Sequence, residues 1–308
     1  MEMILVKDEE RSFYQYKIRV ELKRQVSLFE VDAALSEREQ KNKAVRRAFD
    51  FIDGQDSYIE FNSGSQDISV IKFQKLNDDI LIMKLAKRKS VELTSKETTT
   101  FVEKKQDDYP CAFVVFDAKN QTIYVERAYK LYTLANAMIK ILQDMFGYIN
   151  GQISENSSSK FFINVITSQE EFMDCFNSFN TVNKITLKMD SPNCFLGNRE
   201  ADDFLNELRE ETQAKHSTFE VVSDEGINGA GFYKHFKPLI EYIVRGGGGY
   251  SMRGYTEDSN KPVTKTSFNR IKTLNLTLNF NVNQAQIDNA EELATKISKT
   301  NSYEEEDE

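Results

Sequence analysis

The sequence has no tryptophan and little proline (4) or histidine (2) among its 308 residues. Aromatic burial must therefore rest on 22 phenylalanines and 13 tyrosines. The two histidines, His216 and His235, have no cysteine or carboxylate at metal-ligand spacing, and no G-x-S-x-G turn is present. These absences argue against a histidine metal site and a serine hydrolase, and we predict no catalytic residue, no metal ligand and no cofactor.

Cysteine is also too rare to form a disulfide scaffold or a zinc site. The three cysteines, Cys111, Cys175 and Cys194, are widely spaced, and none forms a C-x-x-C pair. Neither a zinc site nor a disulfide scaffold is indicated. Because each lies in or beside an apolar segment, we predict reduced cysteines of the core.

Long hydrophobic runs are missing. The first residues, "MEMILVKDEERSF", return to charge after a short apolar stretch, unlike a signal peptide. No run approaches the ~18 apolar residues of a membrane span. We therefore expect a cytoplasmic protein without membrane insertion.

Charge is acidic but uneven. Hydrophobic residues make up 40% of the chain and charged ones 29%, which is typical of a soluble globular protein with one large or two ordinary domains. The formal net charge is −9, and residues 304–308 are all acidic, as in a disordered, self-repelling tail. A mildly acidic body disfavours nucleic-acid binding over the whole surface, although it permits a local basic patch.

The first half of the chain has the patterns of a strand-rich domain over residues 1–149. From Phe13 to Lys23, apolar and polar residues alternate with a period of two, as in a half-buried strand. A helix is predicted over 36–52, with Ser36 as its N-cap and Asp53-Gly54 as its end. Short strands and a hairpin follow, with a short helix at 95–104, and the period changes to that of a long helix over 129–148.

The second half alternates strands with helices. Residues 150–160, "NGQISENSSSK", form the best linker candidate, and residues 161–283 predict a second domain with a mixed sheet. Residues 284–308 are expected to be an extension that ends in the acidic tail. The fold class is therefore α+β: a strand-rich N-terminal domain, a long connecting helix, and a C-terminal mixed-sheet domain with a terminal hairpin.

Two segments suggest chemistry but have plainer interpretations. "SDEGINGAGFYK" lies between a predicted strand and a predicted helix, where glycine-rich loops hold phosphates, but its spacing fits no phosphate-binding fingerprint. Asp117 and Glu126 flank a hairpin as the carboxylates of metal nucleases do, although Arg127 replaces the expected lysine. A flexible loop and solvated charges are favoured at the two places.

The stretch "RGGGGYSMRGYTEDSNKPVTKTSFNRIK" concentrates positive charge. Gly246 fits a left-handed helix cap, and Gly247, Gly248 and Gly249 exceed that need, which indicates a close approach of the backbone or a hinge. Two strands and a polar turn follow. Six basic residues oppose only Glu257 and Asp258, with tyrosines interleaved. The candidate nucleic-acid-binding residues are Arg245, Arg253, Lys261, Lys265, Arg270, Lys272, Tyr250 and Tyr255.

The order of elements resembles that of the RexA-type phage-exclusion proteins. It includes the hairpin "YPCAFVVFDAKNQTIYVERAY", a long helix, a β-α-β unit, "KITLKMDSPN", a helix, a glycine turn and a terminal hairpin. The resemblance implies a cytoplasmic sensor that dimerises, binds DNA with little sequence preference, and triggers abortive infection through an effector partner. It supplies no catalytic residues.

We therefore predict a non-enzymatic component of a bacterial anti-phage defence system that binds DNA or RNA non-specifically, as a homodimer with a possible effector partner. Two alternatives remain open from the sequence. One is a metal-dependent nuclease with an unrecognised site. The other is a protein-interaction subunit of a larger defence complex.

Overall fold

A long strand organises the larger part of the molecule. The computed structural model describes residues 6–22, 36–96, 101–129, 131–132, 135–153, 159–190, 199–212, 214, 216–281 and 286–302. Strand β1 (Val6–Leu22) pairs with β14 and then with β9 along one edge, and with β8 along the other. Tyr16, Ile18 and Val20 are buried on one face as the alternation predicts, but Gln15 and Arg19 on the opposite face are buried too, so the strand is not half-buried. Among the described residues, no helix is both long and apolar enough to cross a bilayer.

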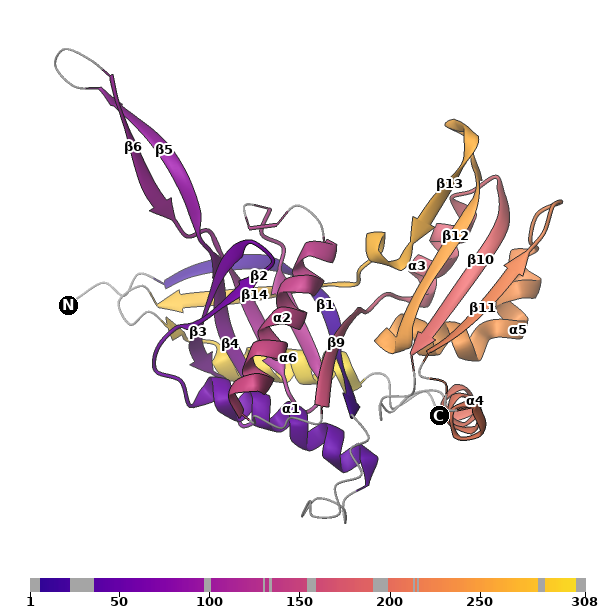
Figure 1. The fold of residues 1–308 in the computed structure, drawn as a ribbon, viewed down its shortest axis with the longest axis horizontal. Helices are drawn as coiled ribbons and strands as arrows, with labels where there is room; N and C mark the ends of the chain where they lie inside the picture. The colour runs from indigo at the N-terminus through magenta and orange to yellow at the C-terminus, as the bar shows by residue number, and fades with distance from the viewer. Residues whose placement is uncertain are drawn as a thin grey trace.

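The large sheet has nine strands (Figure 1). Its order is β15 (Gln286–Ile287), β14 (Thr273–Asn281), β1, β8 (Thr122–Glu126), β7 (Cys111–Asp117), β4 (Ile80–Lys87), β3 (Gln66–Lys75) and β2 (Ile59–Ser63), and β9 (Ser159–Val165) pairs with β1. A separate ribbon of β5 (Lys89–Lys96) and β6 (Phe101–Asp108) projects away from this sheet.

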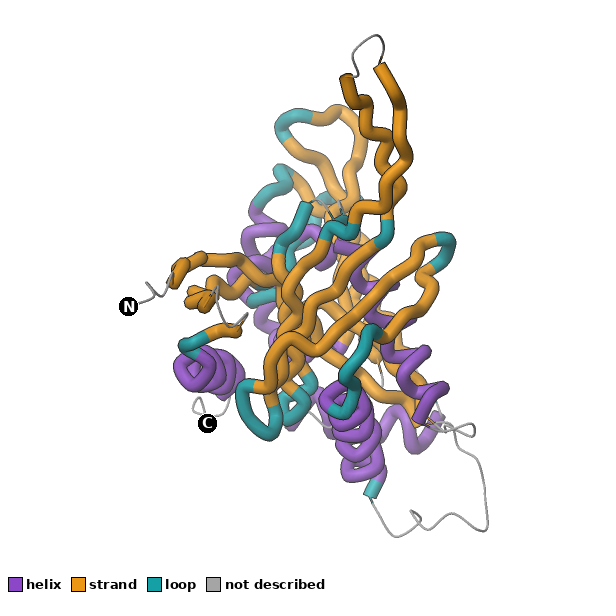
Figure 2. The backbone as a smooth tube through the Cα atoms, turned by 90° about the vertical axis from the view of Figure 1, so that its left-hand side faces the viewer, coloured by secondary structure: helices purple, strands orange, loops and turns teal. Residues whose placement is uncertain are grey.

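Helices cover the two faces of the large sheet, as Figure 2 shows from the side. Helices α1 (Glu37–Asp53) and α2 (Ala135–Ile153) bury one face through a cluster that includes Phe49, Phe116 and Phe146. Helix α6 (Ala290–Ser302) covers the other face, where Leu293 and Ile297 are fully buried. Helix α1 has the predicted caps, a capping box at Ser36 and an end at Gly54.

The small sheet has four antiparallel strands. Its order is β11 (His216–Val222), β10 (Thr181–Asp190), β12 (Gly248–Thr256) and β13 (Ser259–Thr266). Its core packs against α3 (Gln169–Asn177), α4 (Arg199–Thr212) and α5 (Gly229–Tyr242), with Phe172, Ile185 and Ile240 among the buried residues. A short π-helix, η2 (Ile243–Gly247), joins α5 to β12, and a 3-10 turn, η3 (Ser267–Asn269), follows β13.

A polar junction connects the two sheets. The Arg19 side chain, only 4% exposed, extends from β1 to Asp190, with 3.4 Å between Nε and Oδ2. Asn164 of β9 donates to the same carboxylate oxygen and to the carbonyl of Gly246. The Arg19–Asp190 pair and the two hydrogen bonds of Asn164 thus link β1 and β9 of the large sheet to the end of β10 and to Gly246.

The α+β class is confirmed, but sheet membership corrects the expected domain boundaries. Strands β9 and β14, which lie within 161–283, hydrogen-bond to β1 in the large sheet. Part of the expected linker is regular structure, because residues 150–153 end α2 and residues 159–160 begin β9; residues 154–158 lie outside the described part. The chain therefore leaves the large sheet after β9 and returns to it at β14.

Three local expectations also need correction. The short helix was expected at 95–104, but residues 95–96 end β5 and residues 101–104 begin β6, while residues 97–100 lie outside the described part; the expected long helix begins at Ala135. The extension 284–308 contains β15 and α6, whose apolar side the pattern analysis missed; the acidic tail lies outside the described residues. Cys175 is buried as predicted, but Cys111 is exposed at the first position of β7, and Cys194 lies outside the described residues.

Candidate nucleic-acid interface

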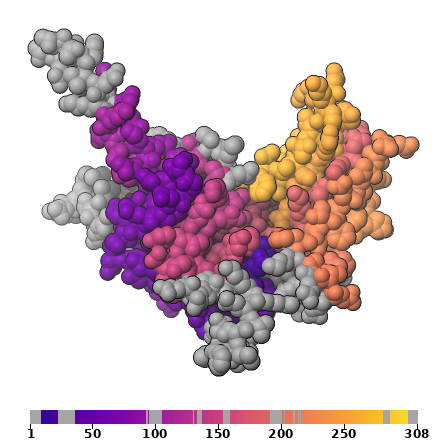
Figure 3. Space-filling model, in the orientation of Figure 1, coloured from indigo at the N-terminus to yellow at the C-terminus, as the bar shows by residue number. Residues whose placement is uncertain are grey.

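The β12–β13 hairpin forms one edge of the small sheet and projects beyond it (Figure 3). Arg253 and Lys261 are exposed on it, and the ring of Tyr255 is 43% exposed. Within the described part of the chain, neither Arg253 nor Lys261 has an ion-pair partner. The predicted hairpin thus presents two cations without ion-pair partners and one accessible aromatic ring, together with the exposed carboxylates of Glu257 and Asp258 at its turn.

Tyr250 is not available to a ligand, contrary to the prediction. It is 3% exposed and packs edge-on against Phe172, with ring centroids 4.8 Å apart. Burial raises the pKa of its hydroxyl far above the usual range. Tyr250 lies on the opposite face of β12 from Tyr255, because side chains alternate along a strand and five positions separate the two.

Two predicted cations are engaged inside the protein. The Lys265 ammonium donates to the Ser178 hydroxyl at 2.7 Å and lies over the ring of Phe179. Arg270 forms an ion pair with Glu171 at 3.0 Å, and the hydrogen bond to that carboxylate raises the pKa of the guanidinium. Both side chains fasten the β13 end to the α3 region, so neither offers its charge freely to a phosphate.

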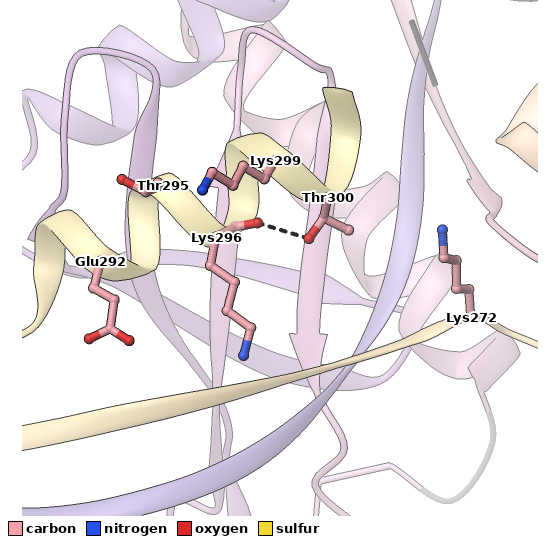
Figure 4. A pocket seen from close by; sticks show the side chains of 6 residues that line it. All are labelled: Lys272, Glu292, Thr295, Lys296, Lys299 and Thr300. Carbon is pink, nitrogen blue, oxygen red and sulfur yellow. Dashed lines mark hydrogen bonds between the residues drawn. The ribbon is translucent and has the colours of Figure 1, made fainter. Parts of the chain in front are cut away.

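Lys272 lies beside residues of α6 (Figure 4). It lines a hollow of about 600 Å³ together with residues of α6: Glu292, Thr295, Lys296, Lys299 and Thr300. The three ammonium groups in Figure 4 point in different directions rather than toward one centre. Arg245 is half-buried in η2. The eight predicted binding residues therefore do not form one surface.

The glycine run has a packing explanation. Gly246 has φ of 95°, as predicted for a left-handed cap, and a Cβ there would lie 2.5 Å from Cβ of Lys17. A Cβ on Gly247 would meet the ring of Tyr242, and one on Gly248 would lie 2.0 Å from the carbonyl oxygen of Lys188. The predicted close approach is thus to neighbouring protein groups.

The small sheet leaves one face uncovered by the described helices, and the sequence patterns did not single out Lys184 and Lys188 on that face. The register pairs Lys184 of β10 with Arg253 of β12 and Val222 of β11, and pairs Lys188 with Gly249. These side chains lie on the face away from the helices, since Ile185, Leu187 and Met252 alternate with them in the core. Figure 1 shows α3 and α5 behind the strands.

Charges on this open face are partly compensated. Lys184 forms an ion pair with Glu220 of β11 at 2.8 Å. Lys188 is exposed and has no ion-pair partner among the described residues. At the end of the face nearest the junction, His216 Nδ1 lies 2.9 Å from Oδ1 of Asp190. Only the strand register could have revealed this grouping, because the residues come from three separated segments.

The two carboxylates behind the nuclease alternative have structural contacts. Asp117 accepts hydrogen bonds from the backbone and side-chain amides of Asn120 and so closes the turn between β7 and β8. Glu126 binds Arg11 and the backbone amide of Phe113. Over the described ranges, no group of three or more histidine, cysteine or carboxylate side chains could hold a metal ion.

The loop before α5 also has a structural interpretation. Asn228 caps the helix by accepting a hydrogen bond from the amide of Gly231. A Cβ on Gly229 would lie 2.4 Å from the ring of Phe176, so glycine is needed there for packing. The loop between β11 and α5 is thus accounted for without a phosphate.

Comparison with known proteins finds no protein family, no curated protein and no solved structure that is significantly similar to this chain.

Proposed function

We propose that this protein is a non-enzymatic, nucleic-acid-binding component that contacts phosphates through the β12–β13 hairpin. The observation that supports the proposal is that Arg253 and Lys261, both exposed and without an ion-pair partner among the described residues, lie on the same hairpin as the exposed Tyr255. Phosphate contacts by lysine and arginine supply most non-specific affinity, and aromatic rings accept any base. A net charge of −9 requires such contacts to be local.

The proposed biological setting is bacterial anti-phage defence, with a homodimer that acts through an effector partner. Its support is the resemblance to the RexA-type proteins, which the sequence carries in its order of elements. The hairpin β7–β8, helix α2, the unit β9-α3-β10 and the hairpin β12–β13 follow one another in that order. The partner and the phage trigger would be sought by co-purification from infected cells.

The direct test incubates the purified protein with plasmid DNA and with RNA, with and without Mg²⁺. A mobility shift without cleavage supports the proposal. Cleavage would favour the nuclease alternative, and neither result would favour a protein-interaction subunit. No contact in the described structure favours either alternative over binding.

Charge variants sharpen this test. Replacing Arg253 and Lys261 with alanine should weaken binding and lower the log–log salt slope by about 0.7–0.9 for each lost phosphate contact. Folding should be unchanged because both residues are exposed. Lys105→Ala is the control for the loss of one exposed cation; this residue is 75% exposed on strand β6 and pairs with Glu92 of β5. Equal losses in the control and in the double variant would argue against a site on the hairpin.

A further inference from the structure

We infer that the open face of the small sheet is a binding platform for single-stranded nucleic acid, with Tyr255 as its stacking residue. The inference rests on the proposed function and adds to it the form of the nucleic acid and four further residues. The platform consists of Lys184, Lys188, Val222, Arg253 and Tyr255, together with Glu220, which limits its charge.

The register arranges these groups along one line. Lys188, then Lys184 with Arg253 beside it, then Tyr255 follow in this order on one face of β10 and β12, and the pair of Thr186 and Ser251 lies between Lys188 and Lys184. With a rise of about 3.3 Å per residue, the line from Lys188 to Tyr255 is roughly 20 Å long. That length suits a few nucleotides of extended single strand, near the lower limit of about 4 nucleotides for single-strand sites.

Exposed apolar groups accompany the cations. The Tyr255 ring is 43% exposed and Val222 is 61% exposed, and Val222 is in register with Lys184. A duplex keeps its bases stacked inside, so it would leave these apolar surfaces unused. A single strand can place a base on the tyrosine ring while its phosphates contact Lys188 and Arg253.

The width of the sheet also argues against a duplex on this face. Three gaps of about 4.8 Å separate its four strands, so the backbone alone is about 14 Å wide. The major groove of B-DNA is about 12 Å wide and admits a helix or a two-stranded ribbon. The face could therefore contact a duplex only through its outer phosphates, whereas a single strand can lie across it.

Glu220 gives the inference a test that misfolding cannot imitate. This carboxylate forms an ion pair with Lys184 within the platform. It therefore neutralises the charge of Lys184 and also repels phosphates. Glu220→Gln should tighten single-strand binding by about two- to tenfold at low salt, because it removes one negative charge within a few ångströms of the strand. A damaged fold would weaken binding instead.

The experiment measures fluorescence anisotropy with a labelled single strand of about 20 nucleotides and with the same labelled strand in a duplex. The single strand should bind more tightly. Tyr255→Leu should weaken its binding by about five- to a hundredfold, the effect of one lost stacked base, and should affect the duplex far less. Lys188→Gln and Arg253→Gln should each lower the salt slope by about 0.7. Lys105→Gln on β6 is the charge-matched control.

The outcomes separate the inference from the proposed function. Duplex binding as tight as single-strand binding, or unchanged affinity in both Tyr255→Leu and Glu220→Gln, would overturn the platform and leave a hairpin that binds nucleic acid. If only Lys261→Gln at the hairpin weakened binding, that result would also overturn the platform and leave a hairpin that binds nucleic acid. No binding to any probe would overturn both.

Discussion

The large sheet and the small sheet differ in how many of their faces are covered. The large sheet has α1 and α2 on one face and α6 on the other, and each face has an apolar cluster. Among the described residues, the small sheet has helices on one face only, and its other face exposes Lys188, Arg253 and Val222. An antiparallel sheet can leave one face to solvent when polar residues alternate outward.

The sheet faces that helices cover stabilise the fold, whereas the open face of the small sheet is available to a ligand. A side chain between sheet and helix contributes to the free energy of unfolding, whereas one on the open face contributes little to it. Variants on the open face can therefore report on binding with the fold intact. The following predictions test that separation.

The largest effect is expected on the face that α6 covers. Ile297→Ala should lower the free energy of unfolding by about 2–5 kcal/mol, because Ile297 is fully buried and alanine leaves a cavity. Val222→Ala on the open face should change it by less than about 0.5 kcal/mol. Urea denaturation measures both. Similar losses in the two variants would mean that the open face is also packed.

A smaller effect is expected where the glycine run meets β10. Gly248→Val should destabilise the small sheet by about 1–3 kcal/mol, because the new Cβ would lie 2.0 Å from the carbonyl oxygen of Lys188. Gly248→Val should therefore lower the stability of the protein as much as its nucleic-acid binding. A hinge, which the four glycines suggest in the sequence, would instead lose binding with little loss of stability.

The control for the glycine variant is Gly147→Ala in α2. No atom lies within 4 Å of a Cβ there, so the variant should be more stable by about 0.5–1 kcal/mol. Thermal unfolding of both variants gives the comparison. An unchanged melting temperature in Gly248→Val would restore the hinge interpretation.

The smallest effect concerns the acidic tail, for which only the sequence supplies evidence. Deleting residues 304–308 changes the formal net charge from −9 to −4. The melting temperature should stay the same, and nucleic-acid binding should become a few-fold tighter at low salt because repulsion decreases. Weaker binding after deletion would give the tail the opposite role.

Local patterns predicted much of the secondary structure. The caps of α1 at Ser36 and Gly54, the alternation in β1 and the left-handed Gly246 all depend on near neighbours in the sequence. The hairpin β12–β13 was also predicted, because a polar turn separates two alternating segments. The helix α6 was not, although its buried residues Leu293, Ala294 and Ile297 have helical spacing.

The candidate site was only partly predictable. The concentration of basic and aromatic residues in the sequence indicated Arg253, Lys261 and Tyr255. The same pattern could not separate these residues from Lys265 and Arg270, because the partners of those two, Ser178 and Glu171, lie far away in the sequence. Side-chain alternation alone would have placed Tyr250 and Tyr255 on opposite faces of a strand. Which of those faces the helices cover depends on long-range packing.

The sequence by itself determined the α+β class, the ends of helix α1 and the concentration of positive charge between Arg245 and Lys272, because propensity, capping and charge are local properties. Only the tertiary structure decided that β9 and β14 return to β1, and that Lys184, Lys188 and Arg253 share an open face. Strand register and the pairing of distant charges depend on which segments meet, and contacts over long sequence separations determine that.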